Sequence, residues 1–126
     1  MILDSCFLID LMAGDDGAIA KLDELTQQAV PVSISSLTVA EVGTGLRNER
    51  ERERFDRLAD QMTVVAFEHR DGRRTARIQR ELGAAGRQIG VLDAMIAATA
   101  IERSEPVVTR NVSEFNRVGD VRVSPY

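Results

Sequence analysis

Three carboxylates, those of Asp4, Glu41 and Asp93, each stand alone within an apolar stretch, although most charged residues of the chain lie in mixed runs. A carboxylate held near a core loses hydration, which is unfavourable unless a cation or hydrogen-bond donors compensate for the loss. Three such groups drawn together would also repel one another. Because Mg²⁺ and Mn²⁺ prefer carboxylate and water oxygens as ligands, these residues predict an acidic site that holds a divalent cation.

Each of these carboxylates also has an ordinary structural interpretation. Thr38 and Glu41 have the spacing of a capping box, in which the glutamate binds back to the start of its own helix. Asp4 is placed to cap the helix that follows it, and Asp93 to interact with a helix dipole. Taken singly, either interpretation is open for each residue, whereas the three together favour the metal site.

Apolar periodicity predicts the elements that position these residues. Strands are expected at residues 1–3, 31–35, 62–67, 106–109 and 121–124, and helices at 7–12, 18–29, 36–46, 47–61, 69–82 and 91–101. The helix at 69–82 is expected to end at Gly83 and Gly86. This alternation predicts a single α/β domain, residues 1–126, with a parallel sheet covered by helices on both faces.

The expected sheet indicates where a site would form. Sites in open α/β sheets gather beyond the carboxyl ends of the strands, so Asp4 and Glu41 are expected to be neighbours there, with Asp93 at the rim of the core. Asn111 and Glu114 leave the fourth strand at the same edge and offer a carbonyl oxygen and a carboxylate. Alternatively, Asn111 makes a turn and Glu114 lies in solvent.

Composition limits the class of protein. The 126 residues carry 16 basic and 20 acidic side chains, a net charge of -4, so any binding of nucleic acid has to be local. The single cysteine, Cys6, is expected to be a small core residue in a reducing compartment. No leader peptide or membrane span is recognisable in the sequence, which favours a soluble cytoplasmic protein.

At its acidic positions the sequence resembles the PIN-domain ribonucleases, and most closely the VapC toxins of prokaryotic toxin–antitoxin pairs. The matching pieces are Asp4-Ser5-x-x-Leu8-Ile9, Ser35 to Val42 with Glu41, Leu92 to Ala100 with Asp93, and Val108-Thr109-Arg110-Asn111 with Phe115. The resemblance implies a three-layer fold with a five-stranded, mostly parallel sheet. It also implies a Mg²⁺ or Mn²⁺ site, endonucleolytic cleavage of RNA, a homodimer, and a VapB-like antitoxin whose tail enters the active groove.

The resemblance also assigns roles to residues. Asp4 and Asp93 would be the principal metal ligands, and Glu41 would bind the ion directly or through water. Many relatives carry aspartate where this chain has Asn111, which would lower the negative charge of the site unless Glu114 substitutes. One firmly held ion is therefore expected rather than two.

A ribonuclease also needs a cationic path for its substrate. Arg70, Arg73, Arg74 and Arg77 recur at the spacing of one helical face and are candidates for contacts to RNA phosphates. The alternative is an ordinary solvated helix face. The mixed run at 47–57 interleaves its arginines with glutamates and is expected to be only that.

Other classes of protein fit the sequence less well. A receiver-like signalling module requires a lysine late in the chain, but the only lysine is Lys21, and a haloacid phosphatase requires a second aspartate after Asp4. A thiol protease built from Cys6 and His69 would leave the carboxylates unexplained, and His69 is expected at the surface. A PIN nuclease outside a toxin system and an inactive PIN-like interaction module remain as alternatives, although the three acids argue against the inactive module.

Overall fold

The centre of the fold in this computed structural model, which describes residues 1–126, is strand β1 (Ile2–Leu3), whose two side chains are fully buried. The other strands are β2 (Ser33–Ser35), β3 (Thr63–Val65), β4 (Val107–Val108) and β5 (Val123–Ser124). They form one sheet in the order β3-β2-β1-β4-β5, and every pairing is parallel. The predicted α/β class is confirmed.

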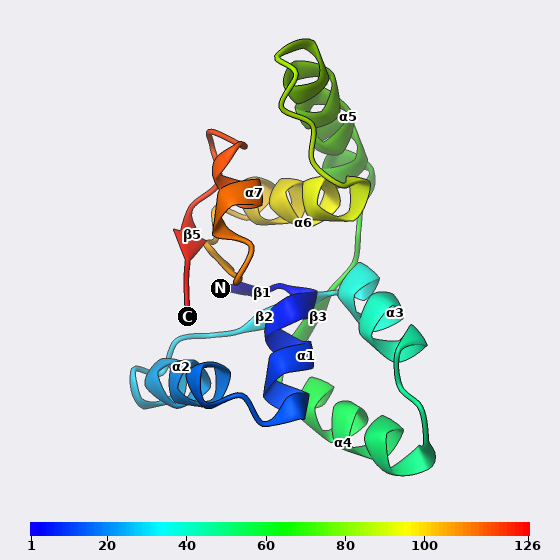
Figure 1. Ribbon diagram of the computed structural model, residues 1–126, viewed down its shortest axis with the longest axis vertical. Helices are drawn as coiled ribbons and strands as arrows, with labels where there is room; N and C mark the ends of the chain where they lie inside the picture. Colours follow the sequence, from blue (N-terminus) through cyan, green and yellow to red (C-terminus); the bar gives the residue numbers. More distant parts are fainter.

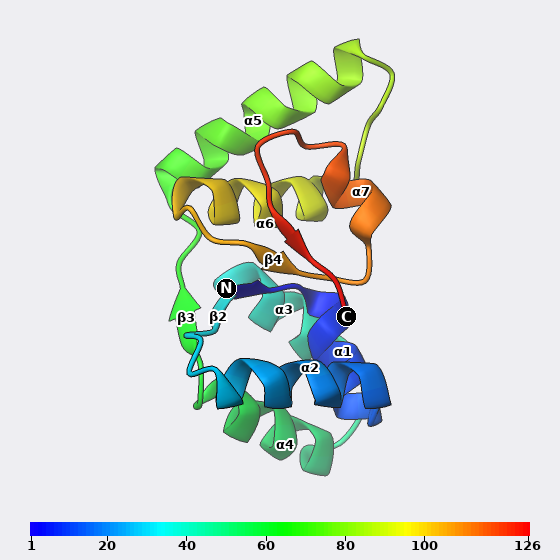
Figure 2. The same ribbon diagram turned by 90° about the vertical axis from the view of Figure 1, so that its left-hand side faces the viewer.

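Helices cover both faces of this sheet (Figure 1). They are α1 (Ser5–Ala13), α2 (Asp16–Gln27), α3 (Ser36–Thr44), α4 (Glu49–Ala59), α5 (His69–Ala84), α6 (Val91–Glu102) and α7 (Val112–Asn116). Successive residues of a strand point to opposite faces, so Ile2 packs in the cluster under α5 and α6 while Leu3 packs with α1 and α2 (Figure 2). The three-layer arrangement is therefore confirmed. No helix has both the length and the apolar character needed to cross a membrane.

Two elements differ locally from the prediction. The helix expected at 69–82 continues past Gly83 to Ala84, and Gly86, the second glycine expected to end it, turns the chain away with φ of 67°. The segment after Thr109 was not predicted to be helical, yet residues Val112–Asn116 form α7. A helix of this length offers too few positions for a periodic pattern to be recognised.

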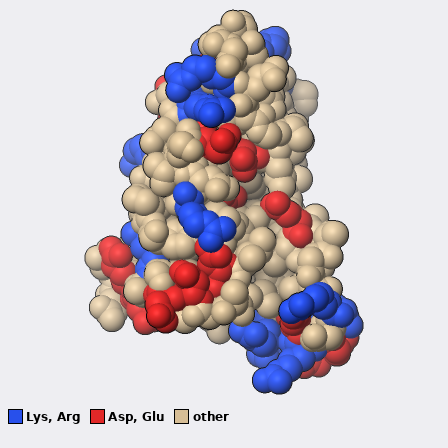
Figure 3. Space-filling model, viewed as in Figure 1, with Lys and Arg blue, Asp and Glu red and all other residues tan.

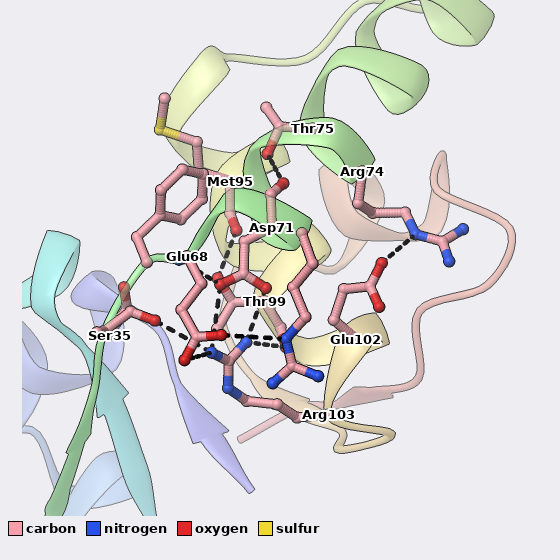
Figure 4. A network of polar contacts seen from close by, with 12 residues as sticks. Ser35, Glu68, Asp71, Arg74, Thr75, Met95, Thr99, Glu102 and Arg103 are labelled. Carbon is pink, nitrogen blue, oxygen red and sulfur yellow. Dashed lines mark hydrogen bonds and ion pairs between the residues drawn. The ribbon is translucent and has the colours of Figure 1, made fainter.

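A buried ion pair joins the start of α5 to the end of α6 (Figure 4). The guanidinium of Arg103 donates from Nη1 to Oδ1 of Asp71 (2.8 Å) and from Nη2 to Oδ2 (3.2 Å), and the Asp71 side chain is fully buried. Arg103 also donates to the carbonyl of Ala66 (3.0 Å), on the segment that leads into α5. The network thereby ties α5 to the helix that carries Asp93.

Candidate active site

Asp4 and Thr109 meet at the edge of the sheet. They follow β1 and β4, the neighbouring strands between which the strand order changes direction, which is where α/β sheets commonly bind ligands. The Thr109 hydroxyl donates to Oδ2 of Asp4 (2.8 Å), and the Ser5 backbone N–H donates to Oδ1 (2.8 Å). Oδ1 retains a second lone pair, whereas Oδ2 also accepts from the Cys6 thiol (3.3 Å). Asp4 is therefore held in one orientation and can still bind a cation.

Asp93 is the third residue of α6 and is half-buried. Burial, followed by the negative charges of Asp4, Glu114 and Glu41, raises the pKa of Asp93 to about 6. The N-terminus of α6 acts in the opposite direction, since a helix dipole stabilises a nearby carboxylate by about 0.3–1 kcal/mol. The structure thus brings four carboxylates from separate segments near enough for their repulsion, together with burial, to outweigh the helix dipole.

Glu41 is an exposed residue in the middle of α3. The helix is capped by Ser35, whose hydroxyl accepts from the Leu37 N–H (3.1 Å), so Thr38 occupies the third helical position that a capping-box glutamate would need. The capping-box interpretation of Glu41 is therefore wrong. Its side chain lines one side of a hollow of about 340 Å³ between α1, α3 and α4.

Glu114 and Asn111, which follow β4, contribute differently to this site. Glu114, in the first turn of α7, adds to the negative charge that acts on Asp93 and lies 3.8 Å from Arg117. Asn111 directly precedes α7 and is exposed, and its side chain makes no capping bond. The backbone N–H of Asn111 instead donates to the Thr109 hydroxyl (3.0 Å), which is the turn expected as its structural interpretation.

The arginines predicted to contact RNA lie away from these carboxylates. All four are on α5, and Arg74 pairs with Glu102 (3.2 Å) at the C-terminal end of α6. Since Asp93 lies nine residues earlier in the same helix, the pair is about 14 Å from Asp93 along the axis. The structure therefore does not place these arginines within the acidic site.

The donor set fits a hydrated divalent cation rather than a closed cage. No three His, Cys, Asp or Glu side chains stand close enough to hold one ion together, and no hollow of the surface is lined by both Asp4 and Asp93. A direct cage of three carboxylates, one of the two arrangements expected from the sequence, is not formed. Mg²⁺ usually keeps several waters and takes one or two protein carboxylates, an arrangement that these neighbouring acids fit.

Two residues that touch Asp4 were not recognised as part of a site. Thr109 belongs to the predicted fourth strand, and its position at the same sheet edge as Asp4 was the available signal. Cys6 was expected in the core, but it is half-buried and its Sγ lies 3.3 Å from Oδ2 of Asp4. Burial, followed by the charge of Asp4, raises the pKa of the Cys6 thiol. Cys6 is thus a protonated neighbour of the carboxylate.

Comparisons with known proteins agree with this arrangement. The model of the PIN domain family matches residues 1–121. The chain belongs to the PIN-domain family. It is 32% identical over 97 residues to the tRNA(fMet)-specific endonuclease VapC of Shigella flexneri, with 74% of each chain covered. The resemblance to VapC-type PIN ribonucleases is confirmed.

Solved structures give the same result. The fold matches that of DNA-bound VapBC from Salmonella typhimurium with a TM-score of 0.89, at 26% identity and with 98% of this chain and 96% of that chain covered. VapBC-1 from nontypeable Haemophilus influenzae matches with a TM-score of 0.84, at 27% identity and the same coverage. Both are VapBC structures, and in each the likeness extends over nearly the whole of this chain.

The bond from Thr109 to Asp4 gives a first prediction. Thr109→Val is expected to lower the free energy of unfolding by about 2 kcal/mol, because a buried carboxylate loses a hydrogen bond while the shape of the side chain is kept. Thr99→Val is the matched control, since Thr99 is equally buried but donates only to the Met95 carbonyl of its own helix (2.8 Å). Urea unfolding compares the two variants, and equal losses would show that Thr109 contributes nothing particular to Asp4.

Proposed function

We propose that this protein is a metal-dependent endoribonuclease that acts as the toxin of a VapBC-type toxin–antitoxin pair. The observation that carries the proposal is the fixed carboxylate of Asp4 at the reversal point of the sheet, with Asp93, Glu41 and Glu114 near enough for their charges to raise the pKa of Asp93. Asp4 and Asp93 would hold one Mg²⁺ or Mn²⁺ ion, with Glu41 and Glu114 reaching it through water. Asn111 lies beside this group and would contribute no charge.

Each acidic residue has a separate role in the proposed phosphodiester hydrolysis. A divalent cation held by Asp4 and Asp93 would supply Lewis acidity, polarising the phosphoryl oxygen and lowering the pKa of a bound water. Asp4 provides a fixed carboxylate, because the Ser5 N–H and the Thr109 hydroxyl hold both of its oxygens. Asp93 is mostly ionised at neutral pH, because its pKa of about 6 is lower than the pH. Glu41, exposed at the rim, orients the attacking water.

The relatives support the substrate class and the partner. The Shigella flexneri protein is named as an endonuclease specific for tRNA(fMet), and the Salmonella typhimurium structure is a VapBC complex. RNA is therefore the proposed substrate, and a VapB-like antitoxin the proposed inhibitor. A receiver-like module is not supported, because the only lysine, Lys21, lies in α2 and not beside the carboxylates.

Cleavage of bulk tRNA by the purified protein tests the proposal. Internal cuts are expected in the presence of Mg²⁺ or Mn²⁺, and none in excess EDTA, with activity restored when the metal is added back. Heating the protein without RNA gives an independent measurement, since Mg²⁺ should raise the melting temperature if it binds the folded state. Cleavage that persists in EDTA, or no cleavage with either metal, would contradict the proposal.

A further inference from the structure

Five arginines of α5 line one hollow on the surface, with a volume of about 330 Å³. They are Arg70, Arg73, Arg74, Arg77 and Arg80, and the only other residue that lines the hollow is Glu102 of α6. We call this feature the arginine hollow. Four of its arginines were recognised from their spacing in the sequence, whereas Arg80 and the acidic residue at its edge are seen only in the structure.

The arginine hollow is separate from the carboxylates but within reach of the same RNA. It extends from Arg70 to Arg80 of α5, which is about 15 Å, and Glu102 lies about 14 Å from Asp93 along α6. Helix α5 begins beside the C-terminal end of α6 and rises away from it (Figure 2). An RNA held at the acidic edge can therefore extend along this flank of the molecule.

The positive charge of the arginine hollow is only partly neutralised. Arg74 pairs with Glu102 (3.2 Å), Arg77 with Glu81 (3.0 Å) and Arg70 with Glu68 (3.4 Å). The last two pairs are largely exposed and so hold their arginines only weakly. Arg73 and Arg80 are exposed and have no acidic partner.

Helix α4 is a charged, solvent-exposed helix with which the arginine hollow can be compared. Its arginines alternate with glutamates, and Arg52 pairs with Glu49 (2.9 Å) while Arg47, just before the helix, pairs with Glu51 (3.1 Å). Blue and red atoms are accordingly intermixed at that end of the molecule (Figure 3, lower right). In the arginine hollow, by contrast, Glu102 is the only acid in the lining, and Glu68 and Glu81 pair with two of its five arginines from outside the lining.

We infer that the arginine hollow binds phosphates of the RNA substrate outside the acidic site, an inference that rests on the proposed nuclease function. Guanidinium groups bind phosphate with two parallel hydrogen bonds, and a face about 15 Å long is long enough to contact more than one phosphate of a strand. Because the whole protein carries a charge of -4, binding of RNA needs a local cationic surface of this kind. Glu102 holds Arg74 when the hollow is empty and competes with phosphate for it.

The test compares two double variants that each remove two exposed, unpaired arginines seven residues apart. Arg73→Gln with Arg80→Gln alters the arginine hollow, and Arg50→Gln with Arg57→Gln alters α4. Binding of fluorescein-labelled bulk tRNA is measured by anisotropy in EDTA, so that no cleavage occurs. The first pair is expected to weaken binding about tenfold at moderate salt and to reduce the slope of log K against log salt by about 1.5, and the control pair to change the affinity less than about twofold.

A third variant, Glu102→Gln, is expected to change binding in the opposite direction. Removing the acid frees Arg74 for phosphate, so the affinity for tRNA should rise by about two- to threefold. A folding defect would not produce this gain. Equal losses of tRNA affinity in the two double variants, or no loss in either, would overturn the arginine hollow as an RNA site. Polyglutamate serves as a polyanion without phosphates. If Arg73→Gln with Arg80→Gln lost affinity for polyglutamate but not for tRNA, the RNA site would likewise be overturned.

These outcomes are separable from those of the nuclease test. If the wild-type protein cleaves tRNA while the variant of the arginine hollow binds it as the control does, only the hollow is refuted. If the wild-type protein does not cleave but the hollow variant still loses affinity, the nuclease function fails and the phosphate site stands.

Discussion

Asp93→Asn is expected to abolish RNA cleavage, lowering its rate by about 1,000-fold or more, while it stabilises the metal-free protein at alkaline pH. The loss of activity follows because the variant removes the charge of a proposed metal ligand, and metal stabilisation of a phosphoryl transition state amounts to several kcal/mol. The gain in stability follows because the same charge is repelled by Asp4, Glu114 and Glu41 and is partly desolvated. Function and stability are thus expected to change in opposite directions.

The sign of the pH effect follows from the pKa of Asp93. Because this pKa is about 6 in the folded protein against an ordinary value of 3.8, the native state holds more protons than the unfolded state between these values. Stability therefore falls as the pH rises through this window. The full shift would correspond to roughly 3 kcal/mol, but the side chain is only half-buried, and solvent screening reduces the effect to about 1 kcal/mol.

Urea unfolding in EDTA measures how the Asp93 charge changes the free energy of unfolding. Asp93→Asn should be more stable than the wild type by about 1 kcal/mol near pH 8, with a much smaller difference near pH 4.5. Adding Mg²⁺ should raise the melting temperature of the wild type and leave that of the variant nearly unchanged. Asp23→Asn is a matched control, because Asp23 is an exposed aspartate of α2 outside the acidic group. Cleavage retained by Asp93→Asn would remove Asp93 from the proposed site.

The position of the carboxylates could be predicted from the sequence because it depends mainly on local pattern. Asp4 ends a strand and Asp93 begins a helix, so both were expected at one end of a parallel sheet. The bond between Thr109 and Asp4 joins residues 105 positions apart and depends on β1 lying beside β4. Apolar periodicity identifies strands but not their order in the sheet, and the contact was therefore not predicted.

Charged residues with a structural role were the least predictable. The segment 69–84 is rich in arginine, and its pattern predicted a basic helix but not the buried carboxylate of Asp71. The partner of Asp71 lies 32 residues later, beyond the end of another helix. Charge runs of this kind indicate a solvated surface on average, and only the packing of α5 on α6 shows which acid is enclosed.

Asp71→Ala is accordingly expected to have the largest effect on stability, lowering the free energy of unfolding by about 3 kcal/mol and the melting temperature by roughly 10 °C. The variant leaves the guanidinium of Arg103, whose side chain is only 13% exposed, without its carboxylate. It also removes the acceptor of the Glu68 N–H (2.7 Å), which caps α5. Thermal and urea unfolding measure the loss.

Control variants separate this ion pair from exposed ones. Glu81→Ala breaks the exposed pair with Arg77 on the same helix and should leave the free energy of unfolding nearly unchanged. The double variant Asp71→Leu with Arg103→Met should be less destabilised than the sum of its single variants, because it leaves no buried charge unpaired.

The pKa of Asp71 makes this ion pair sensitive to acid. Burial alone would raise the pKa, but the hydrogen bonds from Arg103 and the Glu68 N–H, with the charge of Arg103, hold it below its ordinary value of 3.8. The contribution of the pair is therefore fully present above about pH 4 and is lost as the pH falls through the lowered pKa. The stabilities of wild type and Asp71→Ala should converge in strong acid. A difference that stayed constant with pH would assign the loss to packing rather than to the ion pair.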